Sequence, residues 1–221
     1  MPDFSEIPIN LRVPGAYAEI DPVIASQGPG VFPLRALIIG QRIDSSNQFG
    51  LTAGTVDALT LRPTTTVFQA REEHGVGSMT HLLAKDWFSQ GGGVELDIIS
   101  LDDPGVQGTV GRAYTIHRLG GTWDGSPATV YLYIAGCRIE VTITTDFIVA
   151  ANQIVVAVSR ELRDEKVGLP INVFINSPQL GFLRFRANNR GSAGNDIDIR
   201  YNVLPGERFP EGLTILNNGS N

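Results

Sequence analysis

Residues 128–163 read ATVYLYIAGCRIEVTITTDFIVAANQIVVAVSRELR, and this stretch decides the fold of the second half of the chain. Apolar side chains recur at every second position over 130–134 and again over 139–143, on either side of a tight turn at Gly136-Cys137. A period of two predicts a β-hairpin with one apolar face. The residues that follow change to the period of a helix.

This helix is expected to begin after a cap at Thr145 or Asp146, because both side chains can accept hydrogen bonds from the first turn. Its apolar side chains fall on one stripe, made of Phe147, Ala151, Ile154, Val155, Val158 and Leu162. We expect the stripe to cover the hairpin. Three further strands are predicted around residues 171–175, 183–187 and 197–201.

The residues upstream of the hairpin predict a different layer. A strand at 34–40 is expected to be buried, because six of its seven residues are apolar or glycine. Two helices should follow, the first opened by a capping box of Thr66 and Gln69 and the second covering about 78–89. A strand at 94–99 completes the pattern, which indicates an α/β layer with a partly parallel sheet.

The sequence therefore predicts an α+β protein with two domains. Turn residues at 102–105 and several glycines mark a boundary near residue 110. Residues 1–20 are predicted to form an extended N-terminal arm and residues 21–110 a first α/β domain. Residues 111–205 should form a compact inserted α+β domain (hairpin, helix and strands), and residues 206–221 a truncated return segment. The last residues, 217–221, are polar and are expected to be flexible.

Composition narrows the classes of function. The 221 residues are 42% hydrophobic and 18% charged, which suits packed cores, and no apolar run approaches the length of a membrane span. Residues 1–110 hold 6 Lys+Arg and 13 Asp+Glu, a net charge of −7, whereas residues 111–221 hold 11 and 10, a net charge of +1. This balance argues against broad nucleic-acid binding. A single cysteine, Cys137, excludes an internal disulfide.

The segment 7–20 is predicted to be extended, because its prolines prevent a continuous helix. Tyr17 and Glu19 alternate with apolar residues, as in a strand, yet no turn and partner strand follow directly. Such a strand pairs with a distant segment, with another chain or at an edge within its own domain. Sequence alone leaves these alternatives open.

Three short motifs resemble those of tail sheath proteins from Mu-like contractile phages. The first is the opening segment, with Asn10, Leu11, Arg12, Val13, Pro14, Tyr17 and Glu19. The second is Gln69–Met79 (QAREEHGVGSM), and the third is Gly191–Ile197, with the pattern Gly-x-x-Gly-Asn-Asp-Ile. The motifs occur in the order in which that family has them.

The resemblance implies a structural subunit without enzymatic activity or cofactors. Subunits of this family stack around a tail tube and contract, and extended arms link each subunit to its neighbours. The implied partners are other sheath subunits, tube and baseplate proteins, in the virion tail and, during assembly, in the host cytoplasm. The family's proteins are longer, so we expect an N-terminal portion of such a protein. The sheath of a phage-tail-like bacteriocin is an alternative.

Two aspartates near the C-terminus offer a different chemistry. Asp196 and Asp198 lie two positions apart on a predicted strand, so both carboxylates face the same side. They could share a metal ion with Asp124 or Glu140, or they could form the side of the strand that faces solvent. A metal-binding or hydrolytic module using these two aspartates is therefore the alternative from a different class of protein.

Four arginines could instead form a surface for single-stranded nucleic acid or a polar outer face: Arg184, Arg186, Arg190 and Arg200. The loop from Gly191 to Gly194 is predicted to be a turn leading into a strand rather than a phosphate loop. No Cys-His nucleophile arrangement is supported, because Cys137 and the three histidines, His74, His81 and His117, lie in different predicted elements.

Overall fold

The computed structural model describes residues 34–44, 51–104, 111–164, 168–177 and 181–220. These ranges contain strands in three sheets together with helices, a mixed α+β fold, as predicted. Residues from Arg35 onwards form one compact unit. The division of the chain near residue 110 stays a prediction.

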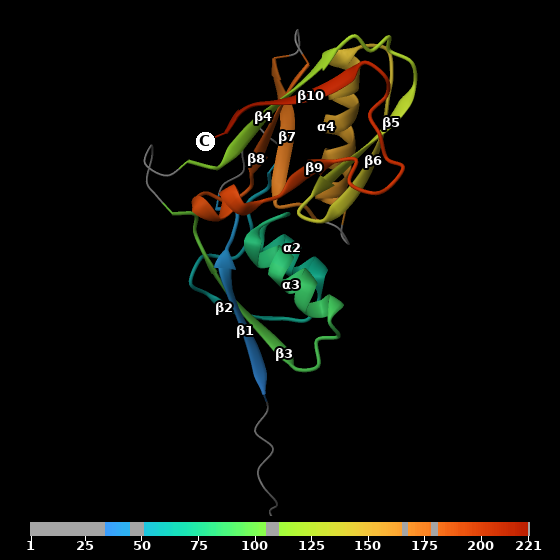
Figure 1. Cartoon of the computed structure of the whole chain (residues 1–221). Coiled ribbons are helices and arrows are strands. Elements are labelled where there is room, and N and C mark those ends of the chain that lie inside the picture. Colours follow the sequence, from blue (N-terminus) through green and yellow to red (C-terminus); the bar gives the residue numbers. More distant parts are fainter. Residues whose placement is uncertain (1–33, 45–50, 105–110, 165–167, 178–180, 221) are drawn as a thin grey trace, which may run out of the picture. The chain divides into compact units, whose positions relative to one another are not determined.

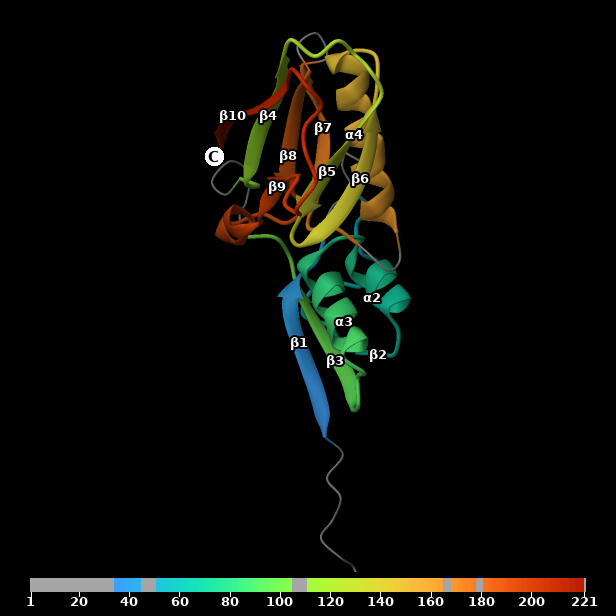
Figure 2. The same ribbon diagram turned by 45° about the vertical axis from the view of Figure 1, so that its right-hand side comes forward.

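The first sheet has the strand order β1-β3-β2. Strand β1 (Arg35–Gln41) runs parallel to β3 (Glu95–Leu101), and β2 (Leu61–Thr64) runs antiparallel to β3. Between β2 and β3 the chain forms α2 (Val67–His74) and α3 (Met79–Ser89), which lie on one side of the sheet (Figure 2). The partly parallel α/β layer that the sequence predicted is thus confirmed.

Burial of β1 was predicted wrongly. Leu37 and Ile39 are 53% and 57% exposed, because helices cover only the other face of the sheet and β1 is an edge strand. The covered face buries Leu96 and Ile98 of β3 against the helices. A run of apolar residues shows that a strand can be buried on both faces, but not that it is.

The predicted hairpin is formed by β5 (Ala128–Ile134) and β6 (Cys137–Ile143). Its turn lies one residue earlier than predicted, at Ala135-Gly136, and Cys137 is the first residue of β6. Both turn residues have positive φ, 48° and 79°, as a two-residue hairpin turn that follows the strand twist requires. Strand β9 (Ile199–Tyr201) pairs with β5 on its other side.

Helix α4 (Phe147–Arg163) begins at the predicted cap, Asp146, whose carboxylate accepts the N–H groups of Ile148 and Val149, each at 2.8 Å. Its buried face packs against β6 and against β7 (Ile171–Ser177), so it covers more than the hairpin (Figure 1). The buried residues are Ala150, Ala151, Ile154, Ala157, Val158 and Leu162. They belong to the main apolar core of the chain.

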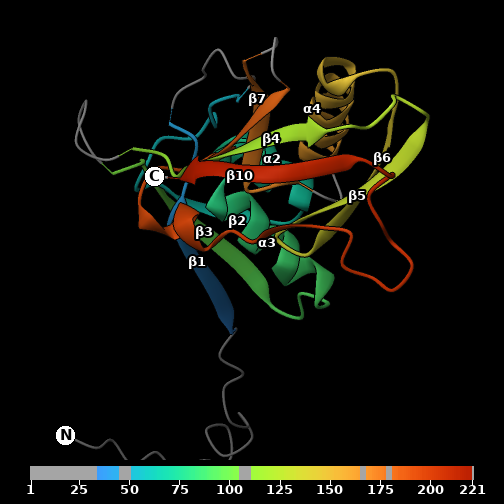
Figure 3. The same cartoon turned by 45° about the horizontal axis from the view of Figure 1, so that its top comes forward.

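The third sheet contains two strands that were not predicted. Its order is β10-β4-β8-β7, with β4 at Tyr114–Gly121, β8 at Phe182–Ala187 and β10 at Leu213–Ser220. Figure 3 shows β10 lying along β4, its antiparallel neighbour. The expectation of a flexible tail from residue 217 was therefore wrong up to Ser220, because the hydrogen bonds between strands join backbone groups, which polar residues carry as well as apolar ones.

Candidate functional site

The first motif, with Asn10, Leu11, Arg12, Val13, Pro14, Tyr17 and Glu19, lies outside the described residues. Its role as an intersubunit arm stays a prediction. The other two motifs lie in described parts of the chain, and the structure shows which contacts their residues make.

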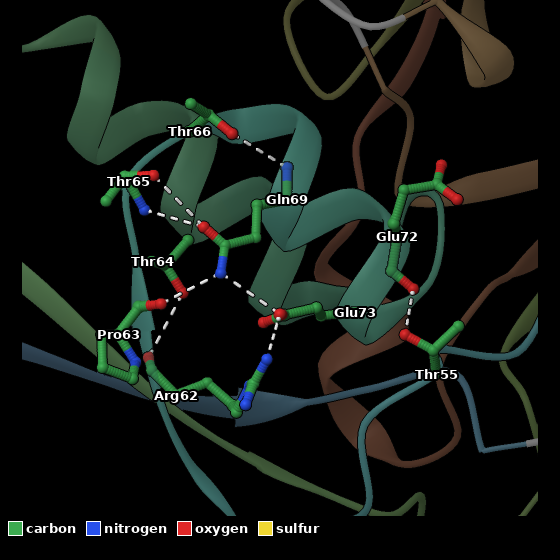
Figure 4. Close-up of polar contacts among 9 residues, drawn as sticks. All are labelled: Thr55, Arg62, Pro63, Thr64, Thr65, Thr66, Gln69, Glu72 and Glu73. Carbon is green, nitrogen blue, oxygen red and sulfur yellow. Dashed lines mark hydrogen bonds and ion pairs between the residues drawn. The ribbon is translucent and has the colours of Figure 1, made fainter.

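The second motif begins in the first turn of α2, where the predicted capping box is present (Figure 4). The Thr66 hydroxyl accepts the backbone N–H of Gln69 at 3.1 Å. The Gln69 side-chain oxygen reaches back to the N–H of Thr65, also at 3.1 Å, and its amide nitrogen donates to the Pro63 carbonyl at 3.0 Å. The cap thus also attaches α2 to the end of β2.

Glu73 makes the second attachment between α2 and β2. Its carboxylate accepts from the Arg62 guanidinium at 2.8 Å and from the Gln69 amide at 3.2 Å (Figure 4). Burial raises the pKa of the Glu73 carboxyl, but the bonds from Arg62 and Gln69 and the Arg62 charge outweigh it, so the pKa lies below the ordinary value. Glu73 therefore stays ionised and binds β2.

Two adjacent asparagines, Asn188 and Asn189, which come just before the third motif in the sequence, bind the end of the second motif. The Asn188 amide is fully buried and donates to the carbonyls of Gly77, at 3.0 Å, and Leu169, at 2.7 Å. The side-chain Oδ1 of Asn189 accepts the backbone N–H of Met79 at 2.9 Å. We call these two residues and their partners the asparagine junction.

A buried ion pair borders the asparagine junction. Arg112 binds Asp103 at 3.2 Å and donates its Nε–H to the Asn188 carbonyl at 2.7 Å, while Asn189 donates to Asp103 at 2.9 Å and to the Arg42 carbonyl at 2.9 Å. Burial raises the pKa of Asp103 above its ordinary value. The hydrogen bonds that its carboxylate accepts and the positive charge of Arg112 act in the opposite direction, but they offset the effect of burial only in part. The junction connects five segments that are far apart in the sequence.

Glycines of both motifs are required by packing. A Cβ on Gly77 would lie 2.3 Å from the Leu169 carbonyl oxygen, and a Cβ on Gly194 would lie 2.7 Å from the Ala187 Cβ. Gly194 belongs to the short 3-10 helix η2 (Ser192–Asp196), which occupies the place of the turn predicted from Gly191 to Gly194 and is followed by the strand β9. Both glycines therefore lie where the chain packs tightly, Gly77 at the asparagine junction and Gly194 against Ala187 and Ala113.

The histidines are all buried. His81 accepts the N–H of Gly77 on Nδ1 at 3.0 Å, and His117 lies 2.8 Å from the Tyr201 hydroxyl. Burial lowers the pKa of each ring to about 4; for His81 the nearby charges of Lys85 and Arg71 add to the effect. Burial also lowers the pKa of His74. The three rings are therefore neutral in the folded chain at pH 7.

We expect the folded chain to lose stability on mild acidification. The unfolded chain binds protons on the rings of His81 and His117 near pH 6.5 but the folded chain only near pH 4, so the free energy of unfolding is highest above pH 6.5 and falls between these values. For His81 the loss at pH 5 is roughly 2 kcal/mol. Urea unfolding at pH 7 and pH 5 measures it.

The matched variant for this measurement is His81→Asn, which keeps an acceptor for the Gly77 N–H but does not titrate. Its stability should change less between pH 7 and pH 5 than that of the parent chain. An identical pH dependence in both proteins would show that His81 is protonated in the folded state.

The carboxylates considered as metal ligands are separated in the structure. Asp196 ends η2 and Asp198 pairs with Arg200 at 2.8 Å, so the two aspartates do not share a strand. Asp124 accepts the N–H of Ser126 and Glu140 lies 4.0 Å from Arg138. Within the described ranges, no three His, Cys, Asp or Glu side chains form a cluster suited to a metal ion.

Three of the four arginines stay near one another, since the charges of Arg184 and Arg190 act on Arg186, whereas Arg200 lies in another sheet. Arg184 and Arg186 lie on β8, Arg190 follows the asparagine junction, and Arg200 lies on β9. Cys137 is half-buried, and burial raises the pKa of its thiol. Sequence reasoning missed Asn188 and Asn189; two adjacent asparagines directly after a strand were the available signal.

In the second motif and directly before the third, these contacts hold segments of the chain together. No family model matches the chain. It is 29% identical, over 227 aligned residues, to the Mu-like prophage FluMu tail sheath protein of Haemophilus influenzae. The alignment covers 98% of this chain and 42% of that relative, so the chain spans less than half of the relative's length. The resemblance to tail sheath proteins is thereby confirmed.

Helices that cross a membrane need both length and hydrophobicity. None of the helices in the described ranges combines the two well enough to cross a bilayer.

Proposed function

We propose that the chain is part of a structural subunit of a contractile phage tail sheath, which polymerises around a tail tube and contracts to drive genome delivery. The observation that carries this proposal is the similarity to a tail sheath protein along 98% of the chain. Its partners would be other sheath subunits, the tail tube and the baseplate. The 42% coverage of the relative supports a longer protein, here called the full-length protein, of which this chain is one part.

The structure supports this proposal through the asparagine junction. Buried polar groups there bind one another and join distant segments, which stiffens the subunit. A contracting sheath rearranges its subunits as rigid bodies, and such movement needs a subunit that keeps its own shape. The same reasoning applies to the sheath of a phage-tail-like bacteriocin.

The proposed link between subunits is the N-terminal arm, residues 7–20. An extended segment can add as a strand to a sheet of a neighbouring subunit, because backbone hydrogen bonds supply the attachment. Within the arm, Tyr17 and Glu19 alternate with small and apolar residues, the pattern of a strand with two different faces.

Labelling of particles tests the proposed location. Gold-labelled antibodies raised against the purified chain should bind along the whole shaft of tails from a host that produces these particles. Labelling confined to the capsid or to the tail tip, with the shaft bare, would contradict a sheath subunit. Antibodies against an unrelated capsid protein serve as the control.

A further inference from the structure

One face of the first sheet is left open by the described residues. Helices α2 and α3 lie on the other side (Figure 2), and alternate side chains of β1, β3 and β2 point away from them. Ile39, Ile99 and Leu61 are paired neighbours, so they form one row across all three strands. We call this side the open face, and its apolar residues are Leu37, Ile39, Leu61, Pro63, Ile99 and Leu101.

The apolar side chains of the open face form a continuous exposed patch. Leu37, Ile39 and Leu61 each expose more than half of their surface, and Leu101 is also exposed. Single exposed apolar side chains are common on protein surfaces, but a patch that crosses several strands marks a contact surface. A packing partner is therefore expected on the open face.

The strand pairing gives the same expectation independently. Strands β1 and β3 are parallel, and parallel strands occur mainly in sheets that are covered on both faces. Strand β1 is also an edge strand whose seven residues include no proline, lysine or bulge, the features that keep exposed edges from pairing. The edge strand on the opposite side, β2, contains Pro63. The sheet thus has the features of an element inside a larger fold.

The core on the helix side of the sheet is small. Within the described ranges, its buried hydrophobic residues are Ala70, Ala84, Leu96 and Ile98. Sheets are stable when their apolar faces are buried against other layers, and here half of the apolar side chains of the sheet lie on the open face. A second layer would bury β3, the central strand, on both sides.

The chemistry of the open face favours packing within one subunit over a contact between subunits. Its apolar side chains are all aliphatic, whereas surfaces that meet between chains are enriched in aromatic residues, methionine and arginine. The charged end of the face is paired within the chain, since Arg35 binds Glu95 at 2.6 Å and Asp97 at 3.1 Å. These charges are already partnered and offer little to another subunit.

We infer that residues of the full-length protein outside residues 1–221 form a further layer that covers the open face. The inference rests on the proposed function in one respect, namely that a longer protein contains this chain. The matched part is 42% of the relative's length, so more than half of that relative lies outside it. The layer would present aliphatic side chains to Leu37 and Ile39 and polar groups to Arg35.

Cysteine labelling measures whether the open face is covered. Ile39→Cys is introduced into the 221-residue chain and into the full-length protein before assembly, and peptide mass spectrometry follows the reaction of position 39 with a maleimide. We expect the reaction to be about tenfold slower in the full-length protein, because the reagent reaches this position only when the covering layer opens. Equal rates in the two proteins would overturn the inference.

Ser89→Cys is the matched control. Ser89 is exposed at the end of α3, on the helix side of the same sheet, and its replacement changes a single atom. Its cysteine should react at the same rate in both proteins. Equal slowing at positions 39 and 89 would show a general effect on access, and slow labelling of position 39 already in the 221-residue chain would show that this chain covers its own face. Either result would contradict the inferred layer.

Cross-linking identifies what lies on the open face. Photo-leucine, a leucine analogue of similar size that carries a diazirine, replaces leucine in the full-length protein, and unlabelled and ¹⁵N-labelled subunits are mixed. We expect links from Leu37 to residues outside 1–221 of the same copy. Links from Leu37 that are confined to residues 1–221, or that join different copies, would refute the inference. A full-length protein with the expected labelling and links that never forms tubes would contradict the proposed function alone.

Discussion

Replacing Gly77 with alanine is expected to destabilise the folded chain by roughly 4 kcal/mol. The added Cβ would lie 2.3 Å from the Leu169 carbonyl oxygen and 2.5 Å from the Asn188 amide nitrogen, and Gly77 has φ +70°, which L residues adopt at a cost. Both groups belong to the asparagine junction, so the backbone must shift and its hydrogen bonds must lengthen. Urea unfolding of the variant and the parent chain measures the loss.

Gly91→Ala is the matched control for this substitution. Gly91 also has a positive φ, +98°, but no atom lies within 4 Å of the place that an added Cβ would take. Its replacement should cost only the backbone strain, about 1 kcal/mol. Equal losses in both variants would mean that the tight packing at the asparagine junction contributes nothing to stability.

The hairpin and α4 could be predicted because their patterns are local. Val130, Leu132 and Ile134 repeat with the strand period, and the stripe through Ile154 and Val158 repeats with the helical one. Each pattern reflects a single buried face, and the structure buries those faces in one core. The cap at Asp146 followed from the same local chemistry.

Strands β4 and β10 could not be predicted in this way. The inward side of β4 carries His117 and Thr115 beside Leu119, and β10 ends in polar residues, so neither shows a continuous apolar alternation. Pairing between these strands joins residues about a hundred positions apart, such as Leu216 and Arg118. Long-range backbone pairing leaves little trace in a local pattern.

The asparagine junction lay beyond sequence reasoning for the same cause. Asn188 donates to Gly77 across 111 positions, and an asparagine in a sequence is equally suited to a turn on the surface. The motifs that indicated the family were visible, but not the contacts between them. The exposed face of β1 was missed because the sequence does not state which faces of a sheet receive helices.

Electron microscopy of the full-length protein, with and without residues 1–20, tests the central proposal most directly. Strand donation predicts regular tubes from the intact protein and none from the shortened one, because each subunit would lose the segment that binds its neighbour. Tubes from the protein that lacks residues 1–20 would contradict the account.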